Sequence, residues 1–177
     1  IIAAGKRASL IDFGIHAGNM TVESIENVKD LAELGIKSFK AFTCSPYLMG
    51  QEQVSRLMEE IKKINGLLFV HAEDEKVLQE YRKKVEDRKD PLAHHDARPV
   101  EAEEKAIKEL LELVKKYSCK THVAHVTSQK GCELIREAKR AHLPVTAETC
   151  IHYLVFSKKD VVEKGPYLKV NPSLKTE

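Results

Sequence analysis

The chain is short of the features that mark membrane, secreted and nucleic-acid-binding proteins. No apolar run approaches the roughly 20 residues that a membrane-spanning helix needs. The net charge is only +2, so no strong field favours nucleic acid or a membrane as partner. No CxxC pair or zinc-ribbon spacing occurs, and we therefore expect a reduced, cytoplasmic setting. The four cysteines are Cys44, Cys119, Cys132 and Cys150.

A start signal is also missing. Residues 1–7 (IIAAGKR) contain no initiator methionine and do not have the layout of a signal peptide. We therefore expect an internal part of a longer protein, incomplete at both ends. The 177 residues, 42% hydrophobic and 32% charged, are ordinary for one soluble globular domain, which we assign to residues 1–177. Abundant, interspersed Lys and Glu residues indicate solvated helix faces.

The chain alternates short apolar runs with longer amphipathic segments. Thr21 and Ser128 are expected helix N-caps, and Gly35 is an expected C-terminal stop. Five strand–helix units in register predict a parallel sheet. The predicted strands are residues 10–16, 36–42, 67–71, 120–126 and 144–150, and the predicted helices are 24–34, 51–64, 75–85, 99–117, 128–141 and a short one near Asp160.

Such a sheet can stay open and be doubly wound, or it can close into a (β/α)8 barrel. No glycine-rich phosphate loop follows any predicted strand, which disfavours the open sheets that bind dinucleotides or nucleoside triphosphates. From the alternation alone, an open α/β binding module of another kind remains an alternative to the barrel.

Three predicted strands end in a side chain that could bind metal: Lys40, His71 and His125. In a barrel the carboxyl ends of the strands converge on one mouth, where active sites are built. A single histidine after a strand is more often a hydrogen-bonded loop residue than a ligand. Lys40 is more unusual, because its apolar neighbours remove solvent and disfavour the charged amine. Three such residues in successive units together predict one site.

Six segments in order carry a resemblance to a known family. The chain resembles the cyclic amidohydrolases, the dihydroorotase, allantoinase and hydantoinase group of the amidohydrolase superfamily, over nearly its whole length. The closest resemblance is to dihydroorotase. The segments are residues 38–42 (SFKAF), 70–74 (VHAED), 97–99 (ARP), 122–128 (HVAHVTS), 146–154 (TAETCIHYL) and 169–172 (KVNP).

The resemblance implies a partial (β/α)8 barrel, about strands 3 to 7, and a metal site. Lys40 would be carboxylated on its amine and bridge two divalent ions, expected to be Zn²⁺. His71 and His125 would ligate the second ion, and Asn171 would contact the cyclic substrate. Such enzymes hydrolyse a cyclic amide, here dihydroorotate to N-carbamoyl-aspartate and back, a step of pyrimidine biosynthesis. The whole protein is expected to be a homo-oligomer.

Parts of the family pattern are absent or altered. No His-x-His metal motif occurs, and the general-base aspartate is expected beyond residue 177, so we expect the chain alone to be inactive. Ser45 stands where hydantoinases carry a substrate-binding tyrosine, with Tyr47 out of register. Ile151 and residues 172–175 (PSLK) also depart from the pattern. Allantoinase, hydantoinase or dihydropyrimidinase activity stays open, as does a non-catalytic assembly protein built on this barrel.

Other histidines are not expected to bind metal. We interpret His16 and His122 as structural, because the matching family segment has no ligand at the first position. The second faces away from His125 or lies deeper in the strand. No role is assigned to His94, His95 or His152.

Overall fold

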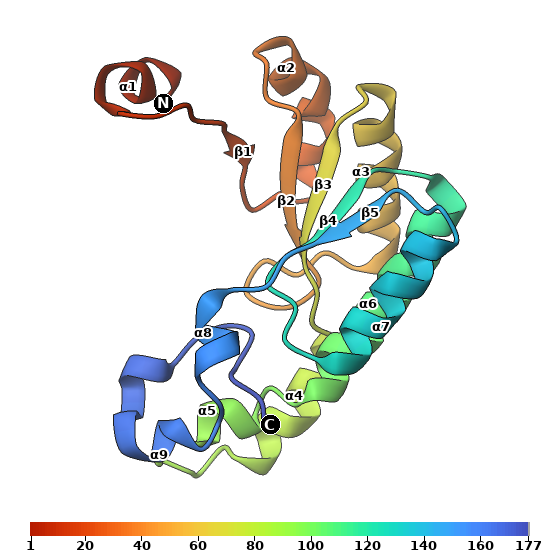
Figure 1. The fold of residues 1–177 in the computed structure, drawn as a ribbon. Helices are drawn as coiled ribbons and strands as arrows, with labels where there is room; N and C mark the ends of the chain where they lie inside the picture. Colours follow the sequence, from red (N-terminus) through yellow and green to blue (C-terminus); the bar gives the residue numbers. More distant parts are fainter. Residues whose placement is uncertain (177) are drawn as a thin grey trace.

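The computed structural model describes residues 1–176, which form an α/β structure around a single sheet (Figure 1). Within these residues the strand order is β1-β2-β3-β4-β5, and every neighbouring pair is parallel. The parallel sheet predicted from the alternation is therefore confirmed. The strands are β1 (His16–Ala17), β2 (Ser38–Phe42), β3 (Leu67–His71), β4 (Thr121–Val123) and β5 (Val145–Ala147).

Helices cover one face of the sheet, and the other face is concave and open. The long helices α3, α6 and α7 lie along the covered face, whereas α4, α5, α8 and α9 lie beyond the carboxyl ends of the strands (Figure 1). The helices are α1 (Ile2–Ala8), η1 (Glu23–Asn27), α2 (Val28–Glu33), α3 (Gln51–Lys63), α4 (Glu75–Lys84), α5 (Ala93–Asp96), α6 (Val100–Tyr117), α7 (Gln129–Arg140), α8 (Ile151–Val155), α9 (Asp160–Lys164) and η2 (Gly165–Leu168).

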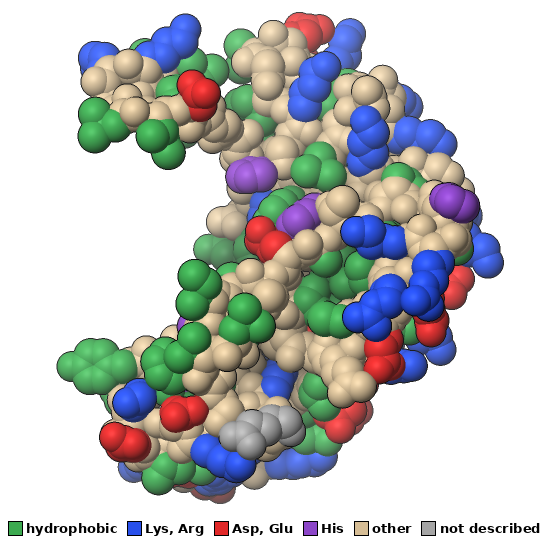
Figure 2. Space-filling view, in the orientation of Figure 1, with side chains coloured by type: hydrophobic (Ala, Val, Ile, Leu, Met, Phe, Trp, Pro, Cys, Tyr) green, Lys and Arg blue, Asp and Glu red, His purple; other side chains and the backbone are tan. Residues whose placement is uncertain are grey.

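The strand order distinguishes between the two architectures that the sequence left open, an open doubly wound sheet and a barrel. A doubly wound sheet reverses its strand order at a switch point and places helices on both faces. Here the order follows the sequence without reversal, and within residues 1–176 no helix covers the concave face (Figures 1 and 2). Sequential parallel strands with helices on the outside are the architecture of a (β/α) barrel wall.

The core lies between the sheet and its helices. Along β2, Phe39 and Ala41 are wholly buried, and they belong to the same apolar cluster as Leu57 and Ile61 of α3. Burial of each large side chain contributes about 1.5–3 kcal/mol. The alternate residues of β2, including Lys40, are only half-buried and face the concave side. Because successive side chains of β2 point to opposite faces, one set packs in the core and the other faces the concave side, where Lys40 lies.

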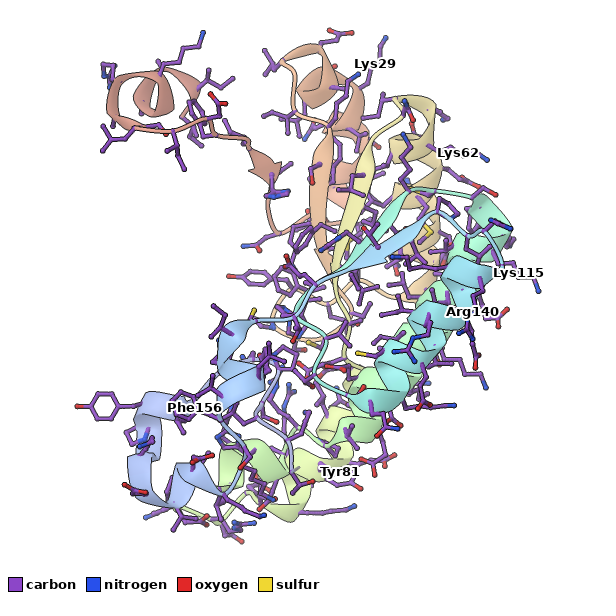
Figure 3. All side chains as sticks on the ribbon, in the orientation of Figure 1. Lys29, Lys62, Tyr81, Lys115, Arg140 and Phe156 are labelled. Carbon is purple, nitrogen blue, oxygen red and sulfur yellow. The ribbon has the colours of Figure 1, made fainter. Side chains whose placement is uncertain are left out.

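The outer faces of the helices carry solvated side chains of both charges, as the interspersed Lys and Glu residues predict. Lys62 of α3, Lys115 of α6 and Arg140 of α7 are exposed and point away from the sheet (Figure 3). No helix in the described part of the chain is long and apolar enough to cross a membrane.

The N-terminal prediction was wrong. The strand expected at residues 10–16 begins only at His16, and residues 2–8, which were not expected to be regular, form α1. Leu10 is 99% exposed and Ile11 is 82% exposed. A strand needs a hydrogen-bonded neighbour and a surface to bury its apolar face, and among the described residues this segment has neither until β1 meets β2.

Other boundaries also differ from expectation; the strand predicted at residues 144–150, for example, spans only Val145–Ala147. Thr21 is not a side-chain N-cap; its backbone N–H donates to Ser24 Oγ, and the helical segment begins as η1. The strand expected at residues 120–126 ends at Val123, because His125 takes a positive φ of 40° that a strand cannot contain. The other caps are confirmed: Ser128 accepts from Gly131 N–H, and Gly35 has a φ of 87°.

Candidate metal centre

Two of the three predicted ligands meet at the carboxyl ends of β3 and β4. His71 is the last residue of β3, and His125 follows β4 by two residues. The Nδ1 atom of His71 lies 3.1 Å from the Nε2 atom of His125. Residues 54 positions apart in the sequence therefore aim ring nitrogens at one point, on the concave side of the sheet. Histidine side chains are visible within this hollow (Figure 2).

The backbone around His125 explains how its ring reaches that point. Ala124 N–H donates to the Val70 carbonyl of β3, and Val126 N–H donates to the Glu148 carbonyl beyond β5. Between these two anchors His125 has its φ of 40°, a conformation that non-glycine residues adopt uncommonly and histidine more often than most. The chain therefore leaves the extended strand conformation at His125, the residue whose ring approaches His71.

His71 is oriented by a buried carboxylate. Its side chain is 5% exposed, and its Nε2 lies 2.6 Å from Oε2 of Glu73, whose side chain is 0% exposed. Arg98 donates to the same carboxylate. An ionised carboxylate only accepts hydrogen bonds, so the neutral His71 ring carries its proton on Nε2. The Nδ1 lone pair then faces His125, where it can accept a hydrogen bond from Nε2–H of that ring or bind a metal ion.

The nitrogen pair fits a divalent cation. Two imidazole nitrogens that share a tetrahedral ion at about 2.0–2.1 Å lie about 3.3 Å apart, close to the 3.1 Å found here. The other ring nitrogen of His125, Nδ1, is not part of this pair and is buried with no hydrogen-bond partner among the described groups. Burial, then His71 and Lys40, lower the pKa of His125 to about 3, so this ring stays in the neutral form that binds metal.

A second group of potential ligands overlaps the pair but is less suited to metal. Cys44, His71 and Glu73 bring one ligand atom each within 4.8 Å of one another. Burial, followed by Glu73, raises the pKa of the Cys44 thiol to about 12, and a protonated thiol is a poor ligand. The Glu73 oxygens are committed to His71 and Arg98. The two-histidine pair is therefore the better candidate for a metal position.

Lys40 lies on the same face of the sheet, two residues before Phe42, the residue that pairs with His71. Its strand neighbour in the register is Phe69, and its Nζ is 4.3 Å from the centre of that ring and 5.1 Å from the Phe42 ring. Burial lowers the pKa of Lys40 to about 8 against the opposing effect of Glu148. The desolvated lysine expected from the sequence is present, although no described hydrogen bond joins it to His71 or His125.

The two histidines interpreted as structural share the concave face. Nδ1 of His16 lies 2.6 Å from Ser38 Oγ. His122 is paired in register with Phe69 and stacks on its ring at 4.8 Å between centroids, with Nδ1 2.7 Å from Thr146 Oγ1. His122 is thus deeper than His125 along the strand direction, one of the two placements expected. Their structural role stays a prediction.

The predicted substrate contact, Asn171, is not joined to this group by any described interaction. It is exposed and follows Val170, whose carbonyl lies 3.0 Å from Nε2 of His94. Its role also stays a prediction. Conversely, sequence reasoning assigned no function to Glu73 or Arg98, and the only signal was their presence in two of the quoted segments.

Comparison with known sequences gives consistent matches. No family model matches the chain. An allantoinase of Bacillus velezensis is 31% identical over 179 residues, covering 97% of this chain and 39% of the relative. A dihydroorotase of Methanothermobacter thermautotrophicus is 32% identical over 176 residues, which are 98% of this chain and 39% of the relative. An L-hydantoinase of Paenarthrobacter aurescens is 29% identical over 179 residues, again covering 98% of this chain and 39% of the relative. The chain spans about two fifths of these relatives.

Solved structures agree with the sequence matches. The L-hydantoinase (dihydropyrimidinase) from Arthrobacter aurescens superposes with a TM-score of 0.90 at 26% identity, covering 99% of this chain and 41% of that one. A D-hydantoinase structure gives a TM-score of 0.85 at 28% identity, covering 94% and 38%. The chain therefore has the fold of part of these larger proteins, as expected for a partial barrel.

Proposed function

Because this chain is homologous to part of the cyclic amidohydrolases, the group of the allantoinases, dihydroorotases and hydantoinases, we propose that the whole protein is a metal-dependent hydrolase of a cyclic amide. The observation that carries the proposal is the 3.1 Å approach of His71 Nδ1 to His125 Nε2 at the carboxyl ends of adjacent strands. Dihydroorotate is the substrate favoured by Asn171. The relatives named allantoinase and L-hydantoinase support allantoin and hydantoins equally.

The ligand set that we propose is Lys40, His71 and His125, with Lys40 acting after carboxylation of its amine. Divalent ions bound there would lower the pKa of a water and polarise the amide carbonyl. Imidazole nitrogens and carbamate oxygens suit Zn²⁺, which is the ion we propose.

The chain's own residues prepare this set in three ways. Glu73 holds the His71 proton on Nε2, leaving Nδ1 available. Burial, followed by His71 and Lys40, lowers the pKa of His125 to about 3, so its ring is neutral near pH 7. The rings of Phe42 and Phe69 flank Lys40 and remove water from its amine, which favours the uncharged form that can react with carbon dioxide.

The test uses the whole protein and a ring-opening assay on dihydroorotate, allantoin and hydantoin, with bound metal measured by elemental analysis. We expect one of these rings to be opened, and we expect His125→Asn to lose both activity and metal. His142→Asn is the matched control, since His142 also has a positive φ, 59°, but is exposed and outside the site. Asparagine tolerates such a conformation at both positions.

The outcomes separate the alternatives. A whole protein that binds no divalent ion and opens none of the three rings would contradict the proposal and favour a non-catalytic assembly protein on the same barrel. Equal loss in the His125 and His142 variants would show a folding defect instead of loss of a ligand. Activity on one ring alone identifies the substrate among the three.

A further inference from the structure

The segment from Arg98 to Glu103, which leads into α6 and forms its first turn, is called the α6 entrance below. Residues 97–99 belong to one of the quoted segments, but the α6 entrance was given no part in the function proposed above. We propose that the α6 entrance positions both histidines of the pair. Arg98 acts on His71 through a buried carboxylate, and Glu103 acts on His125 through the turn that follows it. The inference rests on the proposed function, because it concerns the two histidines as metal ligands.

The first arm runs from Arg98 to His71. The Arg98 side chain is 9% exposed; its Nε donates to Glu73 Oε1 at 3.3 Å, and one terminal nitrogen donates to Oε2. The same Oε2 accepts from His71 Nε2 at 2.6 Å. The backbone beside it is also fixed, because Thr43 Oγ1 donates to the carbonyl of Glu73 at 2.9 Å.

This arm determines which nitrogen of His71 is free. Arg98 donates to both oxygens of Glu73, so the oxygen that lies 2.6 Å from His71 Nε2 is the acceptor of that contact and the ring proton lies on Nε2. A ligand histidine commonly has its orientation and tautomer set by such a partner on its other nitrogen. Without the carboxylate, the ring could carry its proton on Nδ1 and point it at the metal position.

The second arm runs from Glu103 to the turn after His125. Glu103 is 2% exposed, on a helix whose other charged side chains face solvent. Its carboxylate accepts from the backbone N–H of Thr127 at 3.0 Å and of Ser128 at 2.8 Å. Both hydroxyls donate to it as well, at 2.8 and 2.7 Å respectively. Four donors from two consecutive residues leave this turn little freedom.

The turn fixed by Glu103 begins two residues after His125, at the N-terminus of α7. All the hydrogen bonds that Glu103 accepts within residues 1–176 come from uncharged groups. The partial positive charge of the helix terminus compensates the buried carboxylate. With Ala124 and Val126 anchored to β3 and beyond β5, this third anchor completes the constraint on the positive φ of His125.

One backbone hydrogen bond fixes the start of α6 against the end of β3, and so fixes the element that carries both Arg98 and Glu103. Asp74 N–H, just after the β3 end, donates to the carbonyl of Ala102 in the first turn of α6 at 2.8 Å. Arg98 and Glu103 are five residues apart, and each satisfies a different buried partner. The placement of one helix entrance on the sheet therefore sets the geometry at the ends of both β3 and β4.

The test titrates Zn²⁺ into the metal-free whole protein against a chelating indicator, with thermal unfolding of the metal-free protein recorded alongside. We expect Glu73→Gln and Glu103→Gln each to weaken Zn²⁺ binding about 10- to 100-fold, the usual effect of removing a partner of a ligand. Glu101→Gln is the matched control on the same helix turn; Glu101 is exposed, and its variant should bind Zn²⁺ as the unmodified protein does.

Ser128→Ala separates positioning from helix capping. It removes the N-cap of α7 together with one of the four donors to Glu103, whereas Thr127→Val removes one donor and leaves the cap in place. We expect both variants to weaken Zn²⁺ binding several-fold and Ser128→Ala to lower the unfolding temperature further. If Glu103→Gln does not fold, Thr127→Val, which deletes one of the four donors, should weaken Zn²⁺ binding several-fold; unchanged affinity in that variant overturns this arm.

The failures of the two proposals are distinguishable. If the unmodified protein binds no Zn²⁺, the proposed function and this inference fall together. If it binds Zn²⁺ and the Glu73 and Glu103 variants bind equally tightly, whatever their unfolding temperatures, only the positioning role is overturned.

Discussion

Replacing Arg98 by methionine should destabilise the chain strongly at neutral pH and much less in acid. Arg98 is the cationic partner of the Glu73 carboxylate, whose side chain is 0% exposed. Methionine has a similar apolar stem but no charge, so the variant leaves a buried carboxylate paired only with His71. Breaking a buried ion pair in this way costs about 3–5 kcal/mol of the free energy of unfolding at pH 7.

The pH dependence follows from the pKa of Glu73. Burial raises this pKa, but hydrogen bonds from His71 and Arg98 outweigh burial and lower it from 4.5 to about 2. Because the folded pKa lies below the unfolded one, the stabilisation is present above about pH 4.5 and is lost as the pH falls towards about 2. It amounts to about 3 kcal/mol at neutral pH, and roughly 2 kcal/mol of that is lost by about pH 3.

The assay is equilibrium urea unfolding, followed by circular dichroism, of the metal-free 177-residue chain and its Arg98→Met variant at several pH values. Other carboxylates titrate in both proteins, so the difference between the two curves isolates Glu73. We expect that difference to be largest at pH 7 and to shrink by roughly 2 kcal/mol at about pH 3. Arg56→Met, at an exposed position, is the control and should change stability by less than about 0.5 kcal/mol. A constant difference across this pH range would refute the reasoning.

Three further outcomes are expected. In metal-free protein, the amine of Lys40, with its pKa lowered to about 8, should react with an acylating reagent half-maximally near that pH, read by peptide mass spectrometry; a midpoint near 10.5 would contradict its desolvation. Leu57→Ala should lower the urea-unfolding free energy by about 2–5 kcal/mol, whereas Leu10→Ala, at a 99% exposed position, should change it little. Gly131→Ala places a methyl group 2.6 Å from Ser128 Oγ and should lower the unfolding temperature; an unchanged temperature would show that the cap moves freely.

The sequence determined the features that depend on local periodicity and on single side chains. The short apolar run at residues 36–42 predicts the strand observed as β2, and the helical spacing at residues 51–64 predicts α3, because each pattern reflects which residues meet the core. Ser128 could be identified as an N-cap since its bond to Gly131 spans three residues. Lys40 could be identified as desolvated because its own strand neighbours are apolar.

Only the tertiary structure decided the features that need partners distant in the chain. The strand predicted at residues 10–16 failed for lack of a neighbour, and no pattern within those residues shows that. Glu103 belongs to the charged residues that the sequence assigned to solvated helix faces, and Glu73 was given no function, yet both are buried. Arg98 and Ser128, which donate to these carboxylates, each lie 25 residues further along the chain, so the sequence alone does not distinguish either carboxylate from one that faces water. The ends of the strands identified the candidate ligands, and the pairing of β3 with β4 brings the ring nitrogens of His71 and His125 to 3.1 Å.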